Sequence, residues 1–262
     1  MKAWERYFET INEVVEDVKK TQGDNIMKAA ELCAEATIKG GIIYAFGCWH
    51  SLLIAAENFY RAASPANYAA LAVQSINGTI ELSNEGRLES CYGIGDSIVD
   101  YHRIDPKKDV LICISNSGNN IVTVDAALRA KEKGIPLIAI TSVEYGDLMI
   151  TKHQAGKKLK DIADVVIDNK CLIGDAAVAI EGLEVMAGPV SGISMNYILS
   201  SLLVQMSEIV IEKGHKPEVY YNGHVLSMTE EAKAKFEWLK GVDAEKHNGT
   251  FVEKYFYRIK SL

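Results

Sequence analysis

The sequence predicts an α/β fold: a three-layer αβα sandwich with a doubly wound, mostly parallel five-stranded sheet and extra helices at the N-terminus. Two observations predict it. Short, uninterrupted apolar runs are typical of parallel strands that are covered on both faces. They lie at residues 42–46, 68–73, 110–114, 137–140 and 165–167. Helical segments separate these runs, and a repeated strand–helix order gives right-handed βαβ units and an open sheet.

The first 40 residues predict two helices. Over residues 3–20, apolar residues recur at alternating spacings of four and three, which gives one stripe along a helix. The stripe consists of Trp4, Phe8, Ile11, Val15 and Val18. It could pack on its own domain or on a second subunit. A second helix runs from Asn25, a plausible N-cap, to Lys39, and Gly40 and Gly41 end it.

Two helices are also expected between the strands. The helix at residues 51–63 ends before Pro65, and the helix at residues 120–133 ends at Gly134. The polar segment 74–108 is too long for an ordinary connection, so it predicts functional loops or short helices. Past the strands, an irregular stretch (169–190) precedes a clear helix (191–213), and the tail carries an expected strand (218–221), a helix (229–240) and peripheral charged residues.

The chain therefore divides into three parts. Residues 1–40 are N-terminal helices that pack on the domain or on a dimer partner, residues 41–225 form the ligand-binding domain, and residues 226–262 form a helical tail.

Composition excludes several classes of protein. The net charge of −7 argues against a nucleic-acid partner, which usually requires a basic surface. The chain has no run of 18 uncharged apolar residues; the best candidate, Gly192–Ile211, contains Gln205 and Glu208, so no membrane partner is expected. Five cysteines lie far apart with no CxxC pair, which indicates a reduced, cytoplasmic protein.

Two polar turns follow predicted strands, and each leads into a predicted helix. The first is Gly47-Cys48-Trp49-His50-Ser51, and the second is Ser115-Asn116-Ser117-Gly118-Asn119-Asn120. Hydroxyls and amides at a helix N-terminus suit a phosphate, and the two glycines let the backbone approach it. One such turn alone is more often a simple helix cap. Two in one sheet favour a binding site at the carboxyl ends of the strands.

Sequence signatures that this chain lacks narrow the class of ligand. No Gly-Lys-Ser/Thr follows a glycine loop, and the first turn lacks the G-x-G-x-x-G dinucleotide pattern. The histidines show no metal-binding spacing such as H-E-x-x-H. A phosphosugar is therefore the leading ligand, with no cofactor expected.

The two turns resemble the phosphate-binding turns of the SIS (sugar isomerase) family. More narrowly, the chain is similar to an uncharacterised bacterial group of stand-alone SIS proteins that are placed among phosphosugar isomerases. The shared segments include FGCWHS, ENFYRA, DVLICISNSGNN, AKEKG, IAITS and GKKLKDIADVVID. The resemblance covers roughly residues 1 to 225, and its motifs are specific for fold and phosphosugar binding rather than for a reaction.

The resemblance implies which residues bind the phosphate. The family's hydroxyls fall on Ser51, Ser115 and Ser117, and the fourth position, usually Ser or Thr, is Asn120, whose amide can also donate. Trp49 stands where a glycine is common. The expected phosphate-binding set is Gly47, Ser51, Ser115, Asn116, Ser117, Gly118 and Asn120. The resemblance also implies SIS domains that work in pairs, hence a homodimer or a tetramer.

Aldose–ketose isomerisation needs a base that moves a proton between two carbons and an acid that opens the sugar ring. Glu85, in the long polar segment, is the candidate base, although most glutamates in such loops are simply solvated. His50, inside the first turn, could open the ring or hold a structural hydrogen bond. Glu184 is a further candidate carboxylate.

The function predicted is an aldose–ketose isomerase that acts on a sugar phosphate or amino-sugar phosphate through an enediol. One alternative is a non-catalytic phosphosugar sensor, and another is a lyase that opens a sugar ether. A sensor that regulates transcription would carry a DNA-binding part, yet neither the first 40 residues nor the tail concentrates Lys or Arg. This favours an enzyme.

Overall fold

The computed structural model describes residues 1–73, 88–239 and 241–259. Within them, five parallel strands form one sheet in the order β2-β1-β3-β4-β5. The strands are β1 (Ile43–Gly47), β2 (Tyr68–Ala70), β3 (Val110–Ile114), β4 (Leu137–Thr141) and β5 (Val165–Asp168). The predicted α/β class with a doubly wound, five-stranded sheet is therefore confirmed.

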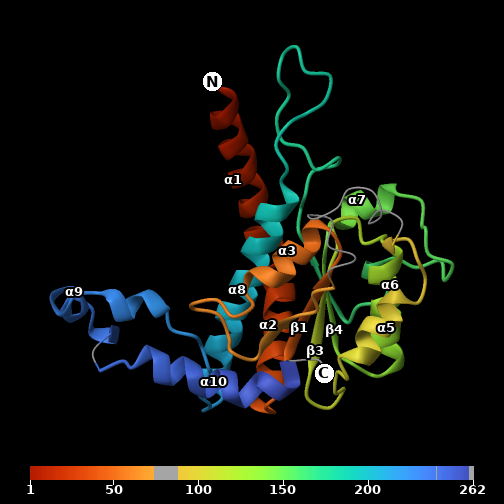
Figure 1. Ribbon diagram of the computed structural model, residues 1–262. Helices are drawn as coiled ribbons and strands as arrows, with labels where there is room; N and C mark the ends of the chain where they lie inside the picture. Colours follow the sequence, from red (N-terminus) through yellow and green to blue (C-terminus); the bar gives the residue numbers. More distant parts are fainter. Residues whose placement is uncertain (74–87, 240, 260–262) are drawn as a thin grey trace.

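Helices cover both faces of the sheet because successive strand residues point to opposite sides. Tyr44 and Phe46 of β1 belong to the apolar core under α5 (Ile94–Tyr101) and α6 (Ile121–Glu132). Ile43 and Ala45 belong to the core on the other face. That face is covered by α2 (Gly23–Ile38), α3 (His50–Glu57) and α8 (Ser191–Glu212). Figure 1 shows the sheet between the two helical layers.

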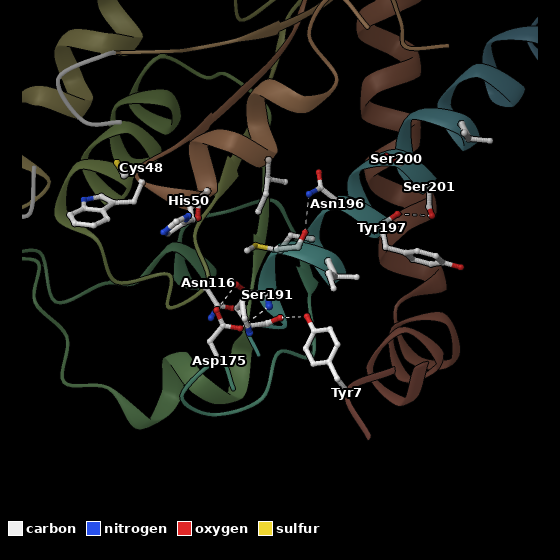
Figure 2. Close-up of a pocket in the computed structure, with 18 of the residues that line it drawn as sticks. Tyr7, Cys48, His50, Asn116, Asp175, Ser191, Asn196, Tyr197, Ser200 and Ser201 are labelled. Atoms are coloured by element: carbon white, nitrogen blue, oxygen red, sulfur yellow. Dashed lines mark hydrogen bonds between the residues drawn. The ribbon is translucent and has the colours of Figure 1, made fainter. Parts of the chain in front are cut away.

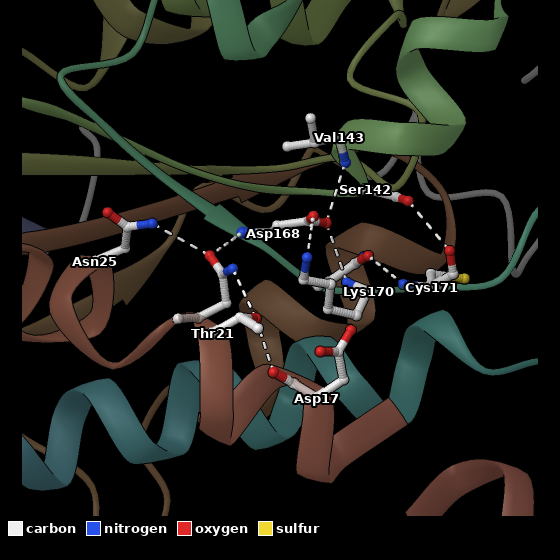
Figure 3. Close-up of polar contacts among 10 residues, drawn as sticks. Asp17, Thr21, Asn25, Ser142, Val143, Asp168, Lys170 and Cys171 are labelled. Atoms are coloured by element: carbon white, nitrogen blue, oxygen red, sulfur yellow. Dashed lines mark hydrogen bonds and ion pairs between the residues drawn. The ribbon is translucent and has the colours of Figure 1, made fainter. Parts of the chain in front are cut away.

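The N-terminal helices are α1 (Ala3–Thr21) and α2, and Gln22 alone separates them. The N-cap of α2 is therefore Gln22, and the prediction of Asn25 as the cap was wrong. The buried Gln22 side chain accepts hydrogen bonds from the backbone N–H of Asp168 (3.0 Å) and from Asn25 (3.2 Å), as Figure 3 shows. The bond from Asp168 attaches the helical pair to the end of β5.

The apolar stripe of α1 is exposed near the N-terminal end of the helix and buried near its C-terminal end. Val18 is buried, whereas Trp4 and Phe8 are 58% and 59% exposed. The first turns of α1 project beyond the body of the molecule (Figure 1).

The predicted helix at residues 51–63 ends earlier, because α3 stops at Glu57 and the chain then turns through positive φ at Tyr60 and Ala63. Two further helices lie in the expected connections: α5 in the long polar segment, and α7 (Val143–Leu148) after β4. A short 3₁₀ helix, η2 (Leu159–Asp161), precedes β5.

The C-terminal tail differs most from the prediction. Residues 218–221 form a single antiparallel bridge, Pro65 with Val219, rather than a strand. Beyond it lie η3 (Gly223–Ser227), α9 (Glu230–Ala234), η4 (Glu237–Leu239) and α10 (Ala244–Ile259). The predicted helix at 229–240 is thus two short pieces, and the charged residues after it form a long helix. That helix is not peripheral, because Phe251 and Tyr255 are buried in the core.

Helix α8 has a length and composition that would suit a membrane span. Half of its most apolar window is buried inside the described fold, as it is in a core helix.

Candidate functional site

The order of the strands places both polar turns at one point of the sheet edge. The chain leaves β1 toward β2 on one side, while β3 lies on its other side, so the strand order reverses between β1 and β3. Gly47 at the end of β1 pairs with Ile114 at the end of β3. The turns that follow these residues are therefore neighbours, although they lie more than 60 residues apart in the sequence.

The first turn is tight and strained. A Cβ on Gly47 would lie 2.8 Å from the Cβ of Ser51, so only glycine fits there. Trp49 has φ 55° and ψ −133°, a conformation that L side chains rarely adopt. The indole packs against the core, and its Nε1 is buried without a hydrogen-bond partner in the described structure. The turn thus holds a large residue in a backbone conformation that suits glycine.

The second turn is held by its own polar groups. Gly118 has φ +61° and donates its N–H to the Ser115 carbonyl (3.1 Å). Asn120 is the N-cap of α6, and its side-chain oxygen accepts from the N–H of Thr123 (3.3 Å). The Asn116 side-chain oxygen accepts a hydrogen bond from the Asn169 amide (2.9 Å). Asn116 therefore fastens the turn to the segment after β5.

A cavity of about 320 Å³ lies over the two turns, and we call it the turn cavity. Its lining includes three hydroxyl residues of the expected phosphate site, Ser51, Ser115 and Ser117, together with Asn116 and Asn120. The rest of the lining is Cys48, Glu89, Asn119, Thr123, Tyr145, Met149, Lys152 and Asp175. The structure thus brings the side chains predicted from the two separate turns into one cavity.

A larger cavity of about 1130 Å³, which we call the groove, lies against residues of α1, α3 and α8. Figure 2 shows it lined by Tyr7 of α1, His50 of α3, and Tyr197, Ser200 and Ser201 of α8. It shares four lining residues with the turn cavity: Cys48, Ser51, Asn116 and Asp175. The two cavities are therefore contiguous, and a ligand held at the turns could extend into the groove.

The predicted catalytic residues are not gathered in the turn cavity. His50 begins α3, is exposed, and lines the groove. Glu184 is exposed on the loop before α8 and belongs to the lining of neither cavity. Glu85 lies outside the described residues.

Three charged residues of the turn cavity were not predicted: Glu89, Lys152 and Asp175. Glu89 accepts a hydrogen bond from the Asn120 amide at 2.5 Å. Burial raises the pKa of Glu89, while the nearby Lys152 and the bond from Asn120 oppose that rise. Glu89 lies four residues after Glu85 in the same segment, so the sequence indicated the segment but not the residue. No sequence signal marked Lys152, because its place depends on a contact with the second turn.

Asp175 lines both cavities. Its carboxylate accepts hydrogen bonds from the N–H groups of Val190 (2.8 Å) and Ser191 (2.7 Å) and from the Ser191 hydroxyl (2.7 Å). Although burial acts in the other direction, the bonds from Ser191 and Cys171 hold the pKa of Asp175 below its usual value. Asp175 thus stays ionised and anchors the start of α8 beside both cavities. Its backbone has φ 53°, so the anchoring loop carries strain of its own.

Comparisons with known proteins identify the family and the fold of this chain. The model of the SIS domain family matches residues 6–142. A UPF0309 protein of Geobacillus kaustophilus is 34% identical over 257 residues, which cover 98% of this chain and 96% of that protein. A UPF0309 protein of Thermoanaerobacter pseudethanolicus is 34% identical over 98% of both chains. A solved phosphoheptose isomerase from Francisella tularensis shares the fold, with a TM-score of 0.52 and 16% identity over 79% of this chain and all of that one.

Proposed function

This chain belongs to the SIS domain family, and from that premise we propose that it binds a sugar phosphate in the turn cavity. The observation that carries the proposal is the gathering of three hydroxyls, those of Ser51, Ser115 and Ser117, in one cavity beyond the ends of β1 and β3. Open α/β sheets bind their ligands at this edge and at the point where the strand order reverses.

The chemistry of the cavity favours a phosphate group. Hydroxyl and amide donors can each give a hydrogen bond to a phosphate oxygen, and such bonds to a charged acceptor are strong. The N-termini of α3 and α6 follow the two turns and present the positive ends of their dipoles. Lys152 adds a full positive charge in the lining. The sugar then extends past Asp175 into the groove.

The reaction that we propose is aldose–ketose isomerisation by proton transfer through an enediol. The base is a carboxylate from the segment after β2. Glu85 stays the prediction from sequence, and Glu89 is the described carboxylate of this segment that lines the cavity, with a pKa raised by burial as a base requires. His50, from the groove side, is the proposed acid for ring opening. Glu184 ranks below them because it lines neither cavity.

A thermal-shift screen with a panel of sugar phosphates tests the binding. A ligand that binds only the folded state raises Tm, so the wild-type protein should respond to at least one of them. Changing both Ser115 and Ser117 to Ala should abolish the shift, because each lost charge-assisted bond costs about 1.5–3 kcal/mol of binding. Ser207→Ala, on the far half of α8, is the matched control and should keep the shift. An unchanged affinity in the double variant would refute the site.

Solvent exchange tests the reaction. An enediol route requires that the C1 or C2 proton of a bound sugar phosphate exchanges with deuterated water, which NMR detects. Replacing the base by Gln should leave binding in place and slow exchange by about 10²–10⁴-fold. If a sugar phosphate binds tightly and neither exchange nor product appears, the protein is a sensor. A product that has lost an ether substituent would instead identify a lyase.

We further propose that the protein acts in the cytoplasm as a homodimer or tetramer, with the site near the subunit boundary. The support is that the groove beside the turn cavity is lined by exposed apolar residues of α8, among them Tyr197 (48% exposed) and Val204 (71%).

A further inference from the structure

Glu89 is attached to the start of α6 in two ways. Its backbone carbonyl accepts a hydrogen bond from the N–H of Val122, the second residue of that helix, at 3.3 Å. Its carboxylate accepts one from the side-chain amide of Asn120, the N-cap, at 2.5 Å. The backbone contact fixes the position of Glu89, whereas the carboxylate can leave Asn120 by a change of side-chain rotamer alone. The carboxylate thus uses a donor that belongs to the proposed phosphate site.

Lys152 is held at the same cavity by the second turn. The side chain of Asn119, only 1% exposed, accepts a hydrogen bond from the N–H of Lys152 (3.0 Å) and donates one to the carbonyl of Ile150 (2.7 Å). The backbone of Lys152 is therefore fixed by the turn itself, while its exposed side chain is left to reach into the cavity. Its charge acts on Glu89 and favours the ionised carboxylate.

A buried pair ties both segments to α6. Asp125 of α6 accepts a hydrogen bond from the N–H of Gly93 (2.7 Å), four residues after Glu89. Its other oxygen contacts Nε2 of His153 (2.8 Å), next to Lys152, and Nδ1 of that ring accepts from the N–H of Ala155 (3.0 Å). Since Nδ1 is an acceptor, Nε2 carries the proton that bonds to Asp125. The segments that carry Glu89 and Lys152 are thus held on one rigid frame.

We propose that the Glu89 carboxylate and the ligand's phosphate compete for Asn120 and Lys152, so that phosphate binding displaces the carboxylate toward the sugar. This inference rests on the proposed function of the turn cavity. The Asn120 amide has two N–H donors and the Lys152 ammonium three, so the competition is one of charge. A carboxylate that stayed beside a bound phosphate in a cavity of about 320 Å³ would be strongly repelled by it. The phosphate is the stronger competitor, because it also binds the serine hydroxyls and the turn N–H groups.

The competition has a consequence for the choice of substrate. A sugar without a phosphate leaves Glu89 bonded to Asn120, away from the carbon whose proton must be moved. A phosphorylated sugar both occupies the turns and releases the carboxylate. The phosphate is then required for the chemical step as well as for affinity.

Isothermal titration with inorganic phosphate tests the competition at fixed ionic strength, since salt screens the charges. Glu89→Gln removes the competing charge but keeps an oxygen for Asn120, so phosphate should bind about tenfold more tightly. Lys152→Met removes the shared cation, so phosphate should bind about tenfold more weakly. The matched controls are Glu253→Gln, exposed on α10, and Lys157→Met, exposed in the same loop as Lys152. Both should leave the affinity unchanged.

The Ser115→Ala/Ser117→Ala variant separates the two proposals. If it abolishes phosphate binding while Glu89→Gln binds no more tightly than the wild type, the competition is refuted and the phosphate site stands. If the serine changes leave binding intact, or if no variant binds phosphate, the proposed function fails and the competition with it. Glu89→Asp provides a second test should Glu89→Gln unfold: its shorter side chain withdraws from Asn120, and unchanged affinity there would also contradict the competition.

Discussion

Among single residues, Glu89 affects both the stability of the fold and the proposed ligand site. Burial raises its pKa, so the folded protein disfavours the ionised carboxylate more than the unfolded chain does. A group with a raised folded pKa contributes stability below its unfolded pKa, and that contribution is lost as pH rises through the folded value. At neutral pH the ionised Glu89 therefore lowers the free energy of unfolding relative to a neutral side chain of the same size.

We therefore expect Glu89→Gln to raise Tm at pH 7 by about 1–3 °C in the absence of phosphate. The gain should shrink as pH falls through about 4 and below, because the wild-type carboxyl then becomes protonated in both states. Thermal melts of both proteins across this range measure it. A gain of equal size at every pH would show that the effect comes from packing and not from the charge.

Trp49 carries backbone strain that a pair of substitutions can isolate. Its φ of 55° costs any L side chain energy that glycine avoids. Trp49→Ala and Trp49→Gly both lose the packing of the indole, so the difference between them reports on the backbone. Glycine is ordinarily the less stable of the two, but here we expect the Gly variant to be more stable by about 1–2 kcal/mol. Urea unfolding measures this, and an Ala variant that is the more stable would disprove the strain.

Among the elements, α10 is joined to the sheet by an ion pair between the partly exposed Arg258 and the buried Asp109. Arg258 donates two hydrogen bonds of 2.8 Å to Asp109, whose side chain is fully buried just before β3. Arg258 also donates to the carbonyl of Gly40 at 3.0 Å. Asp109 accepts from the N–H of Ile42 as well, so the pair holds the tail against the amino ends of β1 and β3.

Arg258→Met should lower the free energy of unfolding by about 2–3 kcal/mol, because it leaves a buried carboxylate without its cation. This is less than a fully buried pair would cost, since Arg258 is one-third exposed. Lys254→Met breaks the exposed pair with Glu218 on the same helix and should cost less than about 1 kcal/mol. Urea midpoints of the two variants compare the losses. Equal losses would mean that α10 is held by its apolar residues instead.

The elements also show how far the sequence predicts this fold. Uninterrupted apolar runs predicted all five strands, because burial on both faces leaves a local pattern. The docking of α10 leaves no such pattern: only a few of its residues, Phe251 and Tyr255 among them, are buried, and its ion pair joins residues 149 positions apart. The phosphate turns were visible because each is a single short segment. Glu89 and Lys152 were not, since each joins the cavity through a contact with a turn more than 25 residues away.

In the whole molecule, exposed apolar side chains lie on α1 and on the groove face of α8. The projecting turns of α1 expose Trp4 and Phe8, and the groove face of α8 exposes Val204 and Tyr197. The loop before α8 reaches α1, where Tyr7 donates its hydroxyl to the carbonyl of Pro189 (2.6 Å). Exposed apolar surface of this extent is typical of an interface between protein molecules.

We expect the protein to be at least a homodimer at micromolar concentration, and light scattering coupled to gel filtration measures it. Val204→Asp places a charge on this face, where burial against a second copy would cost several kcal/mol, so the variant should be monomeric. Trp238→Asp, at an exposed apolar residue of the tail, should leave the assembly intact. Because Val204 lines the groove that adjoins the turn cavity, the monomer should also lose more affinity for a sugar phosphate than for inorganic phosphate. A wild-type monomer would refute the dimer, and a monomeric variant with unchanged sugar phosphate affinity would place the subunit boundary away from the site.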